Sequence, residues 1–108
     1  MIQVIFEQKE GVIIPVIACD VCNKRIEDVM QAAAVNLSIL DMGKTPTKVL
    51  HVHKGKCHDL AEAQVKEQHG HYAGWEELST HLYYLCYNLG LTPQWFEERD
   101  RQFEDDGV

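Results

Sequence analysis

Two short pairs of metal-binding side chains constrain the fold of this 108-residue chain more than any other feature. Cys19 and Cys22 are separated by two residues, and His53 and Cys57 are separated by three. Thiolates and imidazoles at such spacings allow one tight turn to present two ligands to a tetrahedral zinc ion. The spacing therefore predicts a metal site of three cysteines and one histidine that joins two distant turns.

The sequence offers three candidates for the histidine ligand. His53 is favoured because it pairs with Cys57 at a zinc-binding spacing, and His51 and His58 remain alternatives. Cys57 is expected in the first turn of a helix, where free amides and the helix dipole stabilise a thiolate. Four protein ligands complete a tetrahedral zinc site and leave no position for an activated water. We therefore expect one structural zinc ion, which favours a non-enzymatic protein.

Residues 1–57 have the pattern of a β-rich half that carries the zinc knuckle. Apolar, β-branched runs over 2–6 and 12–19 flank a polar loop, which predicts a hairpin. Pro15 lacks the amide hydrogen that a strand ladder needs, so the second strand should lie at an edge or contain a bulge. This strand delivers the chain to Cys19 in the first ligand turn.

The segment between the ligand pairs is expected to form a second hairpin. Residues 23–34 fit both helical spacing and strand alternation, and we interpret them as a short helical turn over 25–30 that leads into a strand over 32–40. The cluster of turn residues over 41–46 predicts a reversal of the chain. The alternating residues 48–53 predict the returning strand.

A helical half follows over residues 57–104. A first helix is expected from Cys57 to a glycine stop at Gly70. A second and longer helix is expected to begin at Gly74. Its predicted buried stripe, at helical spacing, consists of Trp75, Leu78, Leu82, Leu85 and Leu89.

A third helix is predicted where Thr92 can act as the N-cap and Pro93 occupies the first helical position. The acidic residues 105–108 are expected to be a frayed tail. The length is that of one domain. We therefore interpret residues 1–108 as a single α+β domain, in which a small antiparallel sheet with a zinc knuckle precedes two or three packed helices.

The order of these features resembles a known group of small zinc domains. A Cys-x-x-Cys knuckle, a hairpin and a last ligand at the start of a helix are similar to treble-clef and zinc-ribbon domains, and the resemblance covers residues 17–67. Those domains usually carry two Cys-x-x-Cys pairs, whereas this chain has His53-x-x-x-Cys57 as its second pair. The resemblance implies a zinc-stabilised fold that is shared by many functions.

Other chemistries fit the sequence less well. A Cys-x-x-Cys motif after a strand also matches thioredoxin-like redox or metal-handling proteins, but no βαβ pattern follows it, and His53 and Cys57 would be unexplained. A zinc deaminase needs a His-x-Glu ahead of Pro-Cys-x-x-Cys, and the sequence contains neither element. No carboxylate or cysteine shares the spacing of a conceivable second metal site formed by His51, His69, His71 and His81.

The formal net charge is −7 at pH 7, and an acidic chain repels phosphate backbones, which makes nucleic acid an unfavourable partner. The alternative, a nucleic-acid-associated zinc protein, would use the basic face of the second hairpin, formed by Lys44, Lys48, Lys54 and Lys56. No apolar run approaches the length of a membrane span, and the first residues do not have the pattern of a signal peptide. We therefore expect no membrane contact and a cytoplasmic location.

One helix face indicates contact with another protein. Tyr83, Tyr84 and Tyr87 fall on the side of the predicted second helix that is opposite to its apolar stripe. Aromatic side chains outside the core favour a second cover, so a homodimer or another protein partner is expected on the Tyr83/Tyr84/Tyr87 face. The predicted function is that of a zinc-stabilised binding or regulatory protein that acts through protein–protein contacts.

Overall fold

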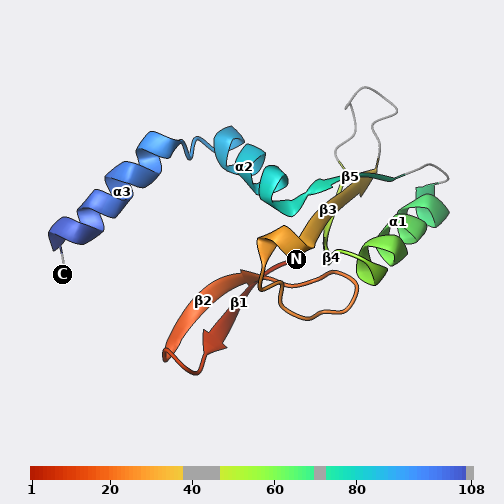
Figure 1. Ribbon diagram of the computed structural model, residues 1–108, viewed down its shortest axis with the longest axis horizontal. Coiled ribbons are helices and arrows are strands. Elements are labelled where there is room, and N and C mark those ends of the chain that lie inside the picture. The colour runs from red at the N-terminus through yellow and green to blue at the C-terminus, as the bar shows by residue number, and fades with distance from the viewer. Residues whose placement is uncertain (38–46, 70–72, 107–108) are drawn as a thin grey trace.

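The computed structural model describes residues 1–37, 47–69 and 73–106. Two antiparallel sheets and three helices make the described part an α+β structure, as predicted (Figure 1). The elements follow in the order β1 (Ile2–Glu7), β2 (Val12–Ile17), the short 3-10 helix η1 (Val29–Gln31), β3 (Ala32–Leu37), β4 (Val49–His53), α1 (Lys56–His69), β5 (Ala73–Glu77), α2 (Leu78–Asn88) and α3 (Pro93–Asp106).

Strands β1 and β2 form the predicted N-terminal hairpin. The amide of Gly11 donates to the carbonyl of Glu7 at 2.8 Å and closes the turn. Pro15 lies opposite Val4 in a sheet of two strands, so it occupies an edge, as expected. The hairpin projects from the rest of the molecule (Figure 1). Its exposed apolar residues are Ile2, Val4, Phe6, Val12 and Ile13.

The second sheet has the strand order β4-β3-β5, and all of its pairs are antiparallel. The β3–β4 pair is the hairpin predicted between the two ligand pairs, and it places Val35 opposite Leu50. The predicted turn over 41–46 lies outside the described residues. β3 begins with three alanines, and their small side chains allow close packing on both faces of the central strand.

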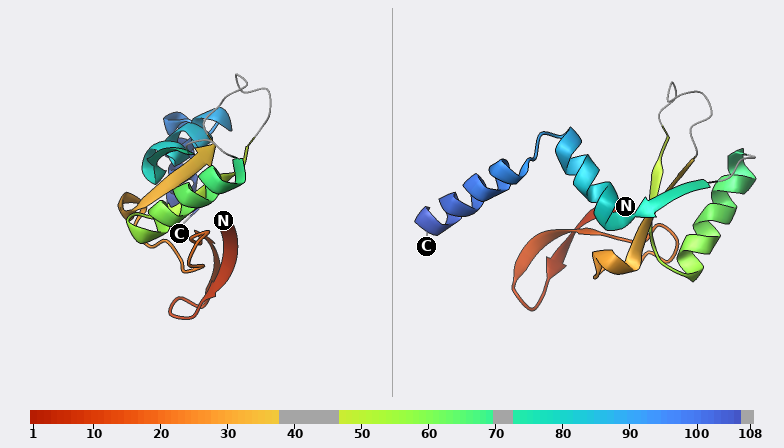
Figure 2. Two further views of the ribbon diagram at one scale, coloured as in Figure 1. Left: turned by 90° about the vertical axis from the view of Figure 1, so that its right-hand side faces the viewer. Right: turned by 45° about the horizontal axis from the view of Figure 1, so that its top comes forward.

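Helices α1 and α2 cover opposite faces of this sheet (Figure 2). On the α1 side, one buried cluster consists of Cys19, Ala33, Val35, Val52, Ala61 and Val65. On the α2 side, a smaller buried cluster consists of Ala32, Ala34 and Leu78. The core is therefore centred on β3, and it includes one of the predicted metal ligands.

The prediction of a long helix from Gly74 is wrong. Residues 73–77 form β5, which pairs with β3, and α2 begins only at Leu78. Pairing with the free edge of β3 satisfies the backbone of this segment and outweighs its helical spacing. The predicted buried stripe is also largely wrong, because Trp75 and Leu89 are 51% and 67% exposed and Leu85 is exposed as well.

The third helix begins as predicted. The amide of Trp95 donates to Oγ1 of Thr92 at 3.2 Å, and Pro93 is the first residue of α3. α3 continues to Asp106, whereas residues 107–108 and the predicted stop at Gly70 lie outside the described residues. None of the helices in the described ranges combines the length and apolar character that crossing a membrane requires.

Candidate metal centre

The first ligand turn is a tight reversal that follows β2. The amide of Ile26 donates to the carbonyl of Ile17 at 2.8 Å, and the amide of Cys19 donates to the carbonyl of Lys24 at 2.8 Å. The amide of Asn23 donates back to the carbonyl of Cys19 at 2.9 Å, and Asn23 itself adopts a positive φ of 65°. Asparagine tolerates this left-handed conformation better than most residues. These bonds define a compact knuckle that presents its two cysteines together.

The second ligand turn connects β4 to α1. β4 ends at His53, and α1 begins at Lys56, so Cys57 lies in the first helical turn as predicted. Gly55 has a φ of 88°, which L-residues with a side chain rarely adopt. Its carbonyl accepts from the amide of Asp59 at 3.0 Å and starts the helix. The sharp strand-to-helix reversal therefore depends on a glycine between the two ligands.

The structure brings the four predicted side chains together. One ligand atom from each of Cys19, Cys22, His53 and Cys57 lies within 4.8 Å of the other three. A zinc tetrahedron with Zn–S bonds of about 2.3 Å and Zn–N bonds of about 2.0 Å has edges of roughly 3.5–3.8 Å. The distance from Cys22 Sγ to His53 Nδ1 is 3.5 Å. The four side chains could therefore hold a metal ion, and all cysteines in the chain are free of disulfides.

The tautomer of His53 suits a ligand that binds through Nδ1. Its Nε2 lies 3.3 Å from the carbonyl oxygen of Arg25. A carbonyl oxygen can only accept, so Nε2 must carry the hydrogen in this contact. In the neutral ring, Nδ1 then keeps its lone pair, and it is Nδ1 that faces Cys22. The knuckle thus orients the imidazole through its own backbone, as is usual for metal-bound histidines.

The two alternative histidines point elsewhere. His58 Nε2 lies 2.9 Å from Glu62 Oε1, and its ring packs against Trp75 with centroids 4.9 Å apart. His51 is buried and makes an edge-to-face ring contact with His81, 6.1 Å between centroids. Neither side chain belongs to the group of ligand atoms within the described residues. Of the histidines considered for a second metal site, His71 lies outside those residues.

The protonation of the clustered thiols shows why a cation fits here. Burial raises the pKa of Cys19, but hydrogen bonds from the backbone amides of Cys22, His53 and Val21 outweigh it and lower the pKa from 9.0 to about 6. Burial, together with the hydrogen bonds and charges of Cys19 and Cys22, raises the pKa of Cys57 to about 11. The protein alone stabilises one thiolate and resists further negative charge, which a divalent cation would offset.

Two side chains near the ligands have roles that the sequence did not reveal. The carboxylate of Asp20, inside the Cys-x-x-Cys turn, binds the backbone of β4. Lys54, which the nucleic-acid alternative would use, places its Nζ 2.6 Å from Oε2 of Glu77 at the end of β5. For Asp20, the only signal in the sequence was a polar residue between two ligands. The contact of Lys54 with Glu77 could not be predicted, because it depends on the strand β5. Lys44, from the same basic group, lies outside the described residues.

Comparisons of this chain with protein-family models, with curated proteins and with solved structures find no match. The class of protein is therefore defined by the fold and the site alone. A group of three cysteines and one histidine in an α+β fold of this size fits a small zinc-binding domain.

Proposed function

We propose that this chain is a non-enzymatic binding protein whose fold is stabilised by one zinc ion held by Cys19, Cys22, His53 and Cys57. The observation that carries the proposal is the convergence of their four ligand atoms within 4.8 Å. These ligands come from the knuckle, the end of β4 and the start of α1, which are separate elements. Convergence of this kind is what a structural metal requires.

The donor set favours zinc over other ions. Thiolates are soft ligands that select zinc, copper(I) or iron–sulfur clusters, whereas magnesium and calcium prefer oxygen ligands. Three thiolates and one imidazole in a tetrahedral arrangement are typical of structural zinc. Because the four ligands fill the coordination sphere, the ion would have no open position at which to activate a water. This supports a structural role rather than a catalytic one.

The position of the site supports a contribution to folding. Among the residues of α1 whose burial the structure describes, only Ala61 and Val65 are buried, so its packing against the sheet is limited. A zinc ion would join the start of α1 to β4 and to the knuckle. Apparent binding free energies of about 10–16 kcal/mol for structural zinc are large compared with the stability of a small domain. Most of the metal-binding energy would therefore be used to fold this half of the chain.

The arrangement of the elements also supports the treble-clef or zinc-ribbon resemblance. The knuckle is followed by the β3–β4 hairpin and then by α1, with Cys57 in the first helical turn. The resemblance rests on this order of elements. It adds no activity or partner to the proposal.

Elemental analysis of the protein purified without added metal tests the proposal. We expect about one zinc ion per chain. Cys57→Ser should lower the zinc content and the thermal midpoint, whereas Cys86→Ser, the matched control outside the site, should leave the zinc content unchanged. A preparation free of metal, in which Cys19 and Cys22 react at once with a thiol reagent, would contradict the proposal and favour a redox protein. Stoichiometric iron or copper would contradict the choice of zinc.

A further inference from the structure

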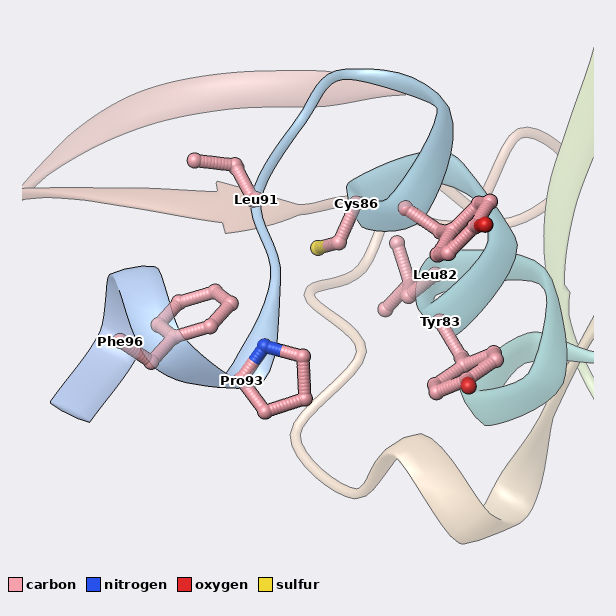
Figure 3. Close-up of a pocket in the computed structure, with 7 residues that line it drawn as sticks. Leu82, Tyr83, Cys86, Leu91, Pro93 and Phe96 are labelled. Atoms are coloured by element: carbon pink, nitrogen blue, oxygen red, sulfur yellow. The ribbon is translucent and has the colours of Figure 1, made fainter.

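An apolar groove lies between α2 and α3 (Figure 3). Its volume is about 410 Å³. α2 contributes Leu82, Tyr83, Cys86 and Tyr87 to its wall, and α3 contributes Pro93 and Phe96. Tyr83 and Tyr87 are more than 60% exposed. No side chain of the described residues fills this groove, and its tyrosine side chains are open to solvent.

Helix α3 lacks a packing partner among the described elements. It extends away from both sheets at one end of the molecule (Figures 1 and 2). One face carries Trp95, Phe96 and Phe103, which are all exposed. The residues around the rest of the helix are mostly acidic. An isolated helix of 14 residues is marginal in water, so this helix needs a surface that covers its aromatic face.

The total surface of the chain is larger than that of a compact monomer. The accessible area is 8256 Å², whereas a compact monomer of 12.4 kDa exposes about 6,100 Å². The radius of gyration is 16.7 Å, against about 13 Å for a compact domain of this length. The excess area of roughly 2,000 Å² is more than the 800 Å² or so that each partner buries in a standard interface. The projecting β1–β2 hairpin and α3 both contribute to this excess, which is large enough to include an interface of standard size.

We propose that the cover is a second copy of this chain, and that the aromatic face of α3 from each protomer occupies the α2–α3 groove of the other. A two-fold dimer needs a knob and a hole on the same chain. Phe96 lines the groove of its own chain, whereas Trp95 and Phe103 do not, so these two side chains can serve as the knobs.

The charges fit a second copy. α2 contains no acidic or basic residue other than His81, so the acidic α3 of a partner meets no like charge on that helix. The groove wall formed by α2 and Phe96 is likewise uncharged and offers nothing to attract a basic peptide. The acidic side of α3 would remain in solvent, where its charge is screened. An uncharged groove therefore receives a face of α3 that carries three aromatic side chains and one cation, Arg99, which lies over the Phe103 ring at 4.7 Å from its centroid.

The molar mass of the metal-loaded full chain, measured by light scattering and sedimentation over a range of concentrations, tests this inference. We expect twice the chain mass of 12.4 kDa. Phe103→Glu should raise the dimer dissociation constant by a factor of about 100, because each interface contains the substitution twice. Phe6→Glu on the β1–β2 hairpin is the matched control, since Phe6 and Phe103 are 61% and 63% exposed. It should leave the dimer intact.

A second variant and a second measurement exclude an effect of misfolding. Tyr87→Glu alters the groove instead of the knob and should also yield monomers, while the metal content per chain stays unchanged in both variants. Cys86 should react faster with a thiol reagent in these variants than in the dimer, because its groove becomes open. A monomer at all concentrations would overturn the inference, as would a dimer that Phe6→Glu disrupts and Phe103→Glu does not.

This inference names the partner for the binding function proposed above and rests on it, but the two can fail separately. A dimer without zinc would contradict the proposed metal and leave the interface standing. A monomer with one zinc per chain would contradict the interface and leave the metal site standing.

Discussion

Asp20 and His51 are joined by a reciprocal pair of hydrogen bonds. The amide of Asp20 donates to the carbonyl oxygen of His51 at 2.8 Å, and the amide of His51 donates to Asp20 Oδ2 at 2.7 Å. Asp20 follows Cys19 directly, and His51 lies two residues before His53. Contacts within the protein therefore hold the knuckle against β4 and help to set the distance between the two ligand turns.

Asp20→Ala should weaken both the fold and the metal site. The substitution leaves the amide of His51 without its acceptor, which costs about 1–3 kcal/mol when the group is buried. Loss of a group that orients metal ligands typically lowers metal affinity by about 10–100-fold. Urea unfolding and competition with a chelator measure the two effects. Asp20→Asn keeps an acceptor oxygen, so its stability and its metal affinity should lie between those of the wild type and of the alanine variant. Equal metal affinity in all three proteins would contradict a role of Asp20 in positioning the ligands.

Gly55 and Gly11 offer a matched pair of turn glycines. Their φ angles are 88° and 69°, and an added Cβ would meet no atom within 4 Å at either position. Alanine should therefore destabilise both turns by about 1–2 kcal/mol through backbone strain alone. Only Gly55 lies between two predicted ligands, so only Gly55→Ala should also lower the affinity for zinc in chelator competition. An equal loss of affinity in Gly11→Ala would show that the effect is global.

His53→Ala should abolish stoichiometric zinc binding at the chelator concentration that the wild type withstands. His58→Ala is the control, because His58 contacts Glu62 and Trp75 instead of the ligand group. It should retain one ion per chain, as measured by elemental analysis after dialysis. Retention of zinc by His53→Ala together with its loss in His58→Ala would move the histidine ligand to position 58.

Those features of the site that depend on short-range spacing could be predicted from the sequence. Cys19 and Cys22 share one turn, and His53 and Cys57 flank a glycine, so each pair is defined within a few residues. The choice of His53 over His51 and His58 could be argued from spacing but not fixed by it. It depends on the direction of each ring, which contacts with Arg25, Asp20 and Glu62 set.

Features that depend on long-range pairing were missed. β5 pairs with the edge of β3 that β4 leaves free, and Trp75 lies opposite Val35 in this pairing. Nothing in the sequence around Trp75 indicates that such an edge is available. Leu78, Leu82 and Leu85 do lie in one helix, as their spacing predicts. The extension of the buried stripe to Trp75 on one side and Leu89 on the other was wrong. Burial follows the position of the sheet, which covers the start of α2 and leaves its end uncovered.

Leu78 and Leu89 test this difference in burial with the same chemical change. Leu78 is 1% exposed and packs against Ala32 and Ala34, whereas Leu89 is 67% exposed. Leu78→Ala should lower the free energy of unfolding by about 2–5 kcal/mol. Leu89→Ala should change it by less than about 0.5 kcal/mol if the residue stays exposed in solution. Urea denaturation of both variants gives the comparison, and a large loss in Leu89→Ala would place it in an interface.

Removal of the metal should loosen one part of the molecule selectively. The proposed ion joins the knuckle, the end of β4 and the start of α1, whereas α3 has little contact with these elements in the described structure. Hydrogen exchange before and after a chelator should therefore show faster exchange in β4 and in the first turns of α1. The amides of α3 should exchange at the same rate in both states and serve as the internal control. Unchanged exchange in β4 after confirmed metal loss would mean that hydrogen bonds such as those of Asp20 hold the knuckle in place without an ion.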